Sequence, residues 1–139
     1  MSSLDQEVLR KIKEWLVYAD EDLRLAQHGL TLVERCPYRL IAYHAQQCAE
    51  KHLKAYLVYQ KIDFPYTHNI SRLLELCPEQ TNWPKTILEA EELTPYAITA
   101  RYSGEDEEVT REEAEQAVRI AVSTREIIRA NLKEVLDLA

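Results

Sequence analysis

Arg39 and His44 are the first candidates for chemistry in this sequence. An imidazole can accept and donate protons near neutral pH, and a guanidinium can stabilise negative charge that develops on a phosphate. This R-x4-H spacing is compatible with metal-independent cleavage of RNA. Residues five apart on a regular helix point about 140° away from each other. The two side chains therefore meet at one phosphate only if Arg39 lies in a frayed first turn or a second copy of the chain completes the site. Otherwise they are an exposed arginine and a packed histidine.

A second set of polar side chains lies in the same segment. Gln47, Lys51 and Lys54 form one stripe with His44 beside it. Two ammonium groups and an amide can hold the phosphates of a nucleotide and hydrogen-bond its base or sugar. An ordinary solvated or helix-packing face explains the same stripe, and Glu50 and Lys54 are a favourable i,i+4 pair that supports a helix.

Two further side chains are secondary candidates. His68 follows Thr67, whose hydroxyl can cap a helix, and Arg101 could contact a phosphate, a carboxylate or the last carbonyls of a helix. The sequence has no glycine-rich phosphate loop, metal-spaced His and Glu set, nucleophile elbow or dinucleotide fingerprint. We therefore expect neither a metal nor a cofactor.

Length and composition indicate one folded domain. The chain has 139 residues, of which 46% are hydrophobic and 29% charged, with only 2 Gly and 5 Pro. These values fit a single helical domain over residues 1–139. No apolar stretch approaches 18 residues and the N-terminus does not resemble a signal peptide, so we expect a cytoplasmic protein without membrane contact. The three cysteines show no spacing typical of disulfides or zinc.

Charge is distributed unevenly along the chain. The net charge of −7 argues against a protein that coats nucleic acid through a general positive field. Residues 35–74 nevertheless carry a net charge of +4, whereas residues 75–115 carry −9. A polyanion or nucleotide would be attracted to the middle of the chain, and the acidic part could dock a basic partner. Two solvated faces of opposite sign explain the same distribution.

Three long stretches carry apolar side chains at helical spacing, at about 4–27, 38–60 and 110–137. Ser3 with Gln6, and Thr110 with Glu113, fit capping boxes at the starts of the first and third stretches. Gly29 offers a stop for the first helix.

Shorter helices are predicted between these stretches. Thr67 can cap one of them and Asn82 another. Thr94-Pro95 repeats this arrangement of a cap and a proline, so residues 83–101 are expected to be two helical pieces with a bend, followed by an acidic loop. No alternating strand pattern and no internal repeat is found. The sequence therefore predicts an all-α, up-and-down helical bundle with three long helices and two or three short ones.

Three sequence blocks in this order strongly resemble the HEPN domain, whose name stands for higher eukaryotes and prokaryotes nucleotide-binding. They are Tyr43-His-Ala-Gln-Gln-Cys-Ala-Glu-Lys-His-Leu-Lys-Ala-Tyr-Leu, Phe64-Pro-Tyr-Thr-His-Asn-Ile with Leu73-Leu74, and Tyr96-Ala-Ile-Thr-Ala-Arg-Tyr-Ser-Gly with Val109-Thr and Glu112-Glu113-Ala114. The likeness covers roughly residues 5–132, which is nearly the whole chain.

The resemblance implies a helical bundle that forms a homodimer and is often encoded beside a minimal nucleotidyltransferase in prokaryotic toxin–antitoxin pairs. Many members of the superfamily are metal-independent ribonucleases with an R-x4-6-H motif at the dimer interface. In the ribonuclease branches that motif belongs to a later helix start. Here the clear copy, Arg39 to His44, overlaps the first block, and Arg101 has no histidine four to six residues after it.

The leading hypothesis is a small HEPN protein that binds a nucleotide, RNA or a nucleotidyltransferase partner. Its predicted binding residues are His44, Gln47, Lys51, Lys54 and Arg101. The first alternative is a metal-independent endoribonuclease toxin with His44 as acid and base and Arg39 as phosphate stabiliser. The second is a non-catalytic interaction scaffold in which the acidic loop 105–108 docks a basic partner.

Overall fold

The computed structural model describes residues 5–79, 81, 83–97 and 108–137. Over these ranges the chain forms helices and no β-strand. The long helices are α1 (Gln6–Gly29), α2 (Tyr38–Tyr59) and α4 (Arg111–Asn131). The short ones are α3 (Ile70–Leu76), the 3-10 helix η1 (Lys85–Ala97) and α5 (Lys133–Asp137). The predicted all-α bundle with three long helices is confirmed.

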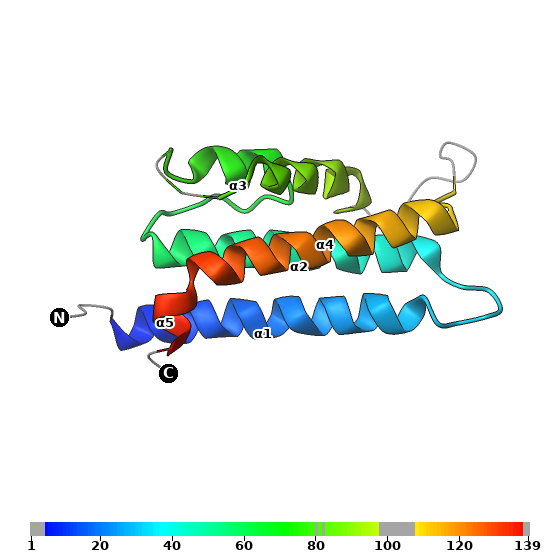
Figure 1. The fold of residues 1–139 in the computed structure, drawn as a ribbon, viewed down its shortest axis with the longest axis horizontal. Helices are drawn as coiled ribbons and strands as arrows, with labels where there is room; N and C mark the ends of the chain where they lie inside the picture. The colour runs from blue at the N-terminus through cyan, green and yellow to red at the C-terminus, as the bar shows by residue number, and fades with distance from the viewer. Residues whose placement is uncertain (1–4, 80, 82, 98–107, 138–139) are drawn as a thin grey trace.

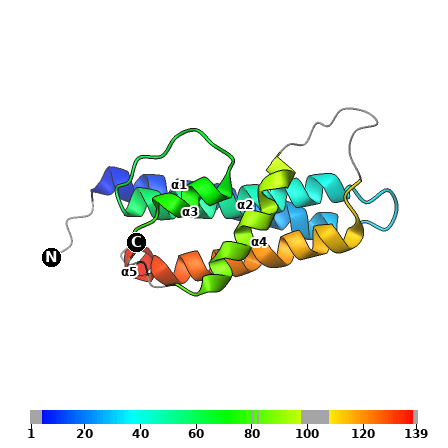
Figure 2. The ribbon, with the colours of Figure 1, turned by 90° about the horizontal axis from the view of Figure 1, so that it is seen from above.

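Helix α2 lies at the centre of the bundle. It runs antiparallel to α1, with α4 alongside (Figure 1), and it packs against α1, α3, α4 and η1. Seen from above, η1 crosses the long helices obliquely (Figure 2). Because neighbours cover α2 on several sides, 14 of its 22 residues are buried. Several polar side chains of α2 are therefore buried as well, among them Gln46, Gln47, Glu50 and Lys54.

The end of α1 lies close to the first turn of α2. Gly29 is the last residue of α1, and a Cβ atom there would lie 2.7 Å from Cγ1 of Ile41. The predicted end of the first helix at Gly29 is thus confirmed. Glycine suits this position because a larger side chain would collide with Ile41.

Two predicted caps differ in the structure. The cap of α1 is Asp5, whose carboxylate accepts a hydrogen bond from the backbone N–H of Glu7 at 2.8 Å, while Ser3 lies outside the described residues. The cap of α3 is Asn69, whose side chain accepts from Arg72 N at 3.3 Å. Thr67 instead accepts from Asn69 N at 3.1 Å and forms the turn that leads into the cap.

The expected bend at Thr94-Pro95 is absent, because η1 runs through Pro95 as one 3-10 helix. Its buried side chains are Ile87, Ala90 and Leu93. A spacing of three residues places them directly in line when the helix has about 3.0 residues per turn. The Thr94 hydroxyl accepts from Ile70 N at 3.2 Å, so it satisfies the first backbone N–H of α3 and starts no new helix. The predicted cap at Asn82 lies outside the described residues.

The last predicted helix is divided in two. Its start is confirmed, because Thr110 and Glu113 form the complete capping box. Near its end the Asn131 amide donates to Ile127 O at 2.9 Å, and Leu132 N bonds to Arg129 O, which interrupts the regular ladder. Helix α5 then turns from α4 toward the start of α1 and buries Val135 (Figure 1). None of the helices in the described ranges is long and apolar enough to cross a membrane.

Candidate functional site

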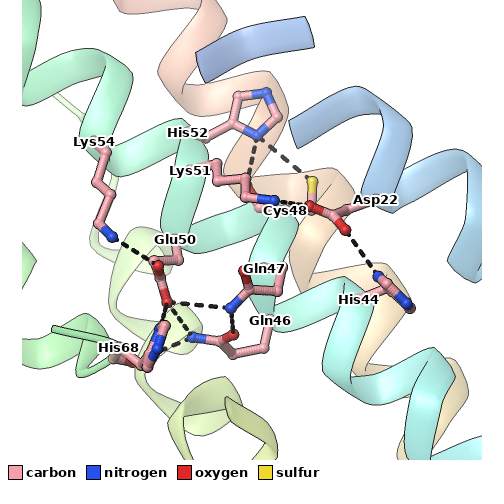
Figure 3. Close-up of polar contacts among 10 residues, drawn as sticks. All are labelled: Asp22, His44, Gln46, Gln47, Cys48, Glu50, Lys51, His52, Lys54 and His68. Carbon is pink, nitrogen blue, oxygen red and sulfur yellow. Dashed lines mark hydrogen bonds and ion pairs between the residues drawn. The ribbon is translucent and has the colours of Figure 1, made fainter. Parts of the chain in front are cut away.

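Three separate groups of polar side chains include residues of α2, and we name them by their central carboxylates. The Asp22 cluster contains Asp22, His44 and Lys51. The Glu50 cluster contains Gln46, Gln47, Glu50, Lys54 and His68. The Asp20 cluster contains Asp20, His52, Arg125 and Arg129. Figure 3 shows the first two clusters on α2 and its neighbours, together with His52 and Cys48.

In the Asp22 cluster one carboxylate of α1 holds two side chains of α2. Asp22 Oδ1 lies 2.8 Å from His44 Nδ1, and Oδ2 lies 2.6 Å from Lys51 Nζ (Figure 3). The side chains of Asp22, His44 and Lys51 are 11%, 25% and 22% exposed, respectively. The cluster therefore lies at the boundary between the helix pair and solvent.

This arrangement orients the histidine. Because a carboxylate only accepts hydrogen bonds, the Nδ1–H of His44 donates to Asp22 and leaves Nε2 for a ligand or a proton. The ammonium of Lys51 has three donors, of which Asp22 uses one. An imidazole held by a carboxylate beside a lysine can bind a phosphate or transfer a proton.

The Glu50 cluster is an internal network. Glu50 Oε2 accepts from Lys54 Nζ at 2.8 Å, and Oε1 accepts from Gln46 Nε2 at 3.0 Å and lies 2.9 Å from His68 Nδ1 (Figure 3). Gln47 Nε2 donates to Gln46 Oε1 at 2.8 Å. The side chains of Glu50 and Lys54 are only 3% and 6% exposed.

Burial and pairing act in opposite directions on Glu50. Burial alone would raise the pKa of its carboxyl, but hydrogen bonds from Lys54, Gln46 and His68 outweigh burial and lower the pKa below its ordinary value. Lys54 also lies over aromatic rings, with Nζ 5.4 Å from the centroid of Trp15. Its charge is therefore compensated by a carboxylate and by ring faces, as a buried ammonium requires.

The predicted stripe of Gln47, Lys51 and Lys54 is thus divided by the structure. Lys51 belongs to the Asp22 cluster near the surface, whereas Gln47 and Lys54 are buried and bonded inside the Glu50 cluster. Of the alternatives for this stripe, a helix-packing face describes Gln47 and Lys54. The physical reason is that α3, η1 and the chain that precedes α3 cover this side of α2.

The Asp20 cluster joins α1, α2 and α4. Asp20 accepts hydrogen bonds from Arg125 Nε at 2.8 Å and from Arg129 at 2.7 Å. His52 is fully buried, and its Nδ1–H donates to Cys48 O at 2.9 Å. Burial lowers the pKa of His52 to about 4 and raises that of Cys48 to about 12, so both side chains are neutral near pH 7. Cys48 is therefore a core residue.

Of the two arginine candidates, the structure describes Arg39 but not Arg101. Arg39 is exposed and is the second residue of α2, which is regular from Tyr38 onward. Five residues of regular helix keep it about 140° from His44 around the axis, so the frayed first turn that would bring the pair together within one chain is absent. Arg101 lies outside the described residues.

The sequence prediction missed Asp22 and Asp20, although the sequence contains a signal for Asp22. It lies three residues after Ala19 and four before Ala26, inside the apolar stripe of the first helix. A carboxylate on that face must find a partner on the neighbouring helix. No group of three or more potential metal ligands occurs within the described parts of the chain.

The fold is an all-α bundle built around the buried helix α2. Comparisons with known proteins identify its family. The family model of the HEPN domain matches residues 12–135, so this chain belongs to the HEPN domain family. It is 30% identical over 146 aligned positions to the "Putative toxin MJ1304" of Methanocaldococcus jannaschii, which covers 94% of this chain and 93% of that protein.

Two solved structures resemble this fold. The crystal structure of TT1696 from Thermus thermophilus has a TM-score of 0.74 and 30% identity, covering 86% of this chain and 97% of that one. The structure of ST0689, an archaeal HEPN homologue, has a TM-score of 0.70 and 25% identity, covering 87% and 97%, respectively. The predicted family and fold are confirmed by these comparisons.

Proposed function

We propose that this HEPN protein is toxin-like and binds RNA or a nucleotide through the surface of the Asp22 cluster. The observation that carries the proposal is the Asp22 carboxylate, which holds His44 at 2.8 Å and Lys51 at 2.6 Å at the solvent boundary. Family membership and the name of the archaeal relative support it. Both side chains keep donor or acceptor capacity for a phosphate or a sugar hydroxyl.

The structure limits the electrostatic part of this proposal. Lys51 and Lys54 account for two of the positive charges in the segment 35–74, and each is paired with a carboxylate. A phosphate that approaches Lys51 has to compete with Asp22. We therefore expect moderate affinity that decreases with salt, because few unpaired charges take part.

Fluorescence anisotropy with a labelled single-stranded RNA tests this proposal. Lys51→Ala and His44→Ala should each weaken binding about threefold to tenfold, the loss expected for one ordinary hydrogen bond. Lys85→Ala removes an exposed lysine of η1 and should leave affinity unchanged. Equal affinities for all four proteins, or no binding at about 50 mM salt, would refute the proposal.

A metal-independent ribonuclease is the second candidate, and the contact between Asp22 and His44 favours it. A carboxylate at Nδ1 fixes the tautomer that lets Nε2 act as general base or acid. Arg39 of a second copy of the chain would then stabilise the phosphate. RNA cleavage in the presence of chelator should be lost in His44→Ala and kept in His28→Ala, which changes an exposed histidine of α1. Intact RNA after prolonged incubation with folded protein would exclude this reaction.

The homodimer and the nucleotidyltransferase partner stay predictions that rest on the family resemblance. Size-exclusion chromatography with light scattering tests the dimer, and co-purification tests the partner. The acidic loop of the scaffold alternative lies outside the described residues except for Glu108.

A further inference from the structure

The chain between α2 and α3, residues 61–69, contacts the Glu50 cluster, and we call this segment the strap. Figure 2 shows it as an arch between the end of α2 and the start of α3. The structure describes every residue of the strap, and none of them is buried. Residues 63–68 make no backbone–backbone hydrogen bond with the described part of the chain. Segments of this kind open locally at a small cost in free energy.

The strap is fastened to α2 through Lys54 and Glu50. The ring centroids of Phe64 and Tyr66 lie 5.8 Å and 5.9 Å from Lys54 Nζ. His68 Nδ1 lies 2.9 Å from Glu50 Oε1 (Figure 3). Tyr66 is itself 89% exposed. Cation–π contacts and hydrogen bonds at such exposed positions are individually weak, so the strap is held by several small contributions.

The first half of the strap leaves open space beside α1. A cavity of about 670 Å³ lies between α1 and residues 61–64. Trp15 and Phe64 both line it, with ring centroids 6.4 Å apart and planes tilted by 59°. Protein interiors are normally close-packed, so a space of this size leaves the strap with few packing contacts on that side.

The strap has a turn at each end. Lys61 has a φ angle of 60°, in the left-handed region, and Ile62 N bonds to Leu57 O at 2.9 Å to close the end of α2. At the other end the Thr67 hydroxyl accepts from Asn69 N at 3.1 Å, just before α3 begins. Hinges are commonly a few residues at such ends of helices, where backbone rotations concentrate.

We propose that the strap is a lid that opens and closes over Lys54 and Glu50 while the helices stay folded. In the closed state these two side chains are 6% and 3% exposed. Opening removes the rings of Phe64 and Tyr66 from Lys54 and the hydrogen bond of His68 from Glu50. The lid thereby converts a buried ion pair of α2 into an accessible one. It does not depend on the RNA binding proposed for the Asp22 cluster.

Acetylation of lysines in the native protein by sulfosuccinimidyl acetate, followed by peptide mass spectrometry, tests the lid. Lys54 should react more slowly than the exposed Lys85 but faster than global unfolding allows. The rate at Lys54 should depend only weakly on urea below the unfolding transition, because opening of the strap exposes little surface.

Two substitutions should favour the open lid. Tyr66→Ala removes one ring over Lys54 and should raise its acetylation rate about twofold to fivefold. Pro65→Gly keeps both rings and makes the open strap more flexible, with an increase of about the same size. Both should keep nearly the wild-type melting temperature. Tyr18→Ala and Pro84→Gly, at an exposed tyrosine of α1 and an exposed proline before η1, should leave the rate at Lys54 unchanged.

Lys54 that reacts only with the rate and urea dependence of global unfolding would overturn the proposal, because the strap would then not open alone. Lys54 that reacts as fast as Lys85 would show that the strap does not cover it. Unchanged rates in Tyr66→Ala and Pro65→Gly, or equal increases in the two control variants, would show that the strap does not control access to Lys54.

Discussion

Lys54 and Glu50 form an ion pair inside the bundle, with Nζ 2.8 Å from Oε2 and side-chain exposures of 6% and 3%. On an isolated helix the same i,i+4 spacing is a surface pair that contributes only a few tenths of a kcal/mol. Here both charges have left water, so each depends on the other and on the surrounding amides and rings.

Removal of one partner should therefore be costly. Lys54→Met leaves Glu50 as a buried carboxylate without its counter-charge, and we expect a loss of about 3–5 kcal/mol in the free energy of unfolding. In a double variant with Lys54→Met, the substitution Glu50→Gln removes the buried negative charge and keeps an acceptor for Gln46 and His68. The double variant should be more stable than Lys54→Met alone, as measured by urea denaturation. A double variant that loses the full sum of the single effects would contradict this interpretation.

Acid should destabilise the fold through His52. Its folded pKa of about 4 lies below the ordinary value of 6.5, so the unfolded chain binds the proton more readily. This contribution to stability is complete above pH 6.5 and is lost as the pH falls toward 4, by up to about 3 kcal/mol. The lowered pKa of Glu50 acts in the same direction at lower pH, because its stabilisation is lost only as the carboxylate becomes protonated.

Urea denaturation between pH 7 and pH 4.5 measures the effect of His52. His52→Gln should be less stable than the wild type at pH 7 but should depend less steeply on pH. His28→Gln, at an exposed position of α1, should keep the wild-type slope. A His52→Gln slope equal to that of the wild type would show that His52 does not cause the dependence.

Gly29 should not tolerate a methyl group. An added Cβ would lie 2.7 Å from Cγ1 and 3.1 Å from Cδ1 of Ile41, which is 2% exposed and cannot move into solvent. The gain of about 1 kcal/mol in helix propensity should be outweighed by overpacking of about 1–3 kcal/mol. Gly29→Ala should therefore lower the melting temperature. In an Ile41→Ala background the same change should be neutral or stabilising. Destabilisation in both backgrounds would show that the contact with Ile41 is not the cause.

The long helices could be predicted from the sequence because their apolar spacing and caps are local signals. The capping box of Thr110 and Glu113 and the boundaries of α2 are examples. The 3-10 winding of η1 was not predicted, because apolar side chains three residues apart, such as Ile87, Ala90 and Leu93, also occur on α-helices.

The environment of α2 could not be predicted from its own pattern. A period of 3.6 residues identifies the face that packs on one neighbour, but α2 has four neighbours. For that reason Glu50 and Lys54 were identified as an i,i+4 pair but not as a buried one, and Lys51 was grouped with Lys54 although the two contact different carboxylates. Pairing of Asp22 with His44 depends on the packing of α1 on α2, which no local pattern in either helix specifies.

We propose that the Asp22 cluster contacts RNA, whereas the Glu50 cluster stabilises the fold. RNA affinity of Lys51→Ala compared with the Glu50→Gln/Lys54→Met double variant tests it most directly, because both remove a lysine from α2. We predict weaker binding for Lys51→Ala with its melting temperature nearly unchanged, and wild-type affinity for the double variant with its melting temperature lowered. Weaker binding by the folded double variant together with unchanged binding by Lys51→Ala would contradict the claim.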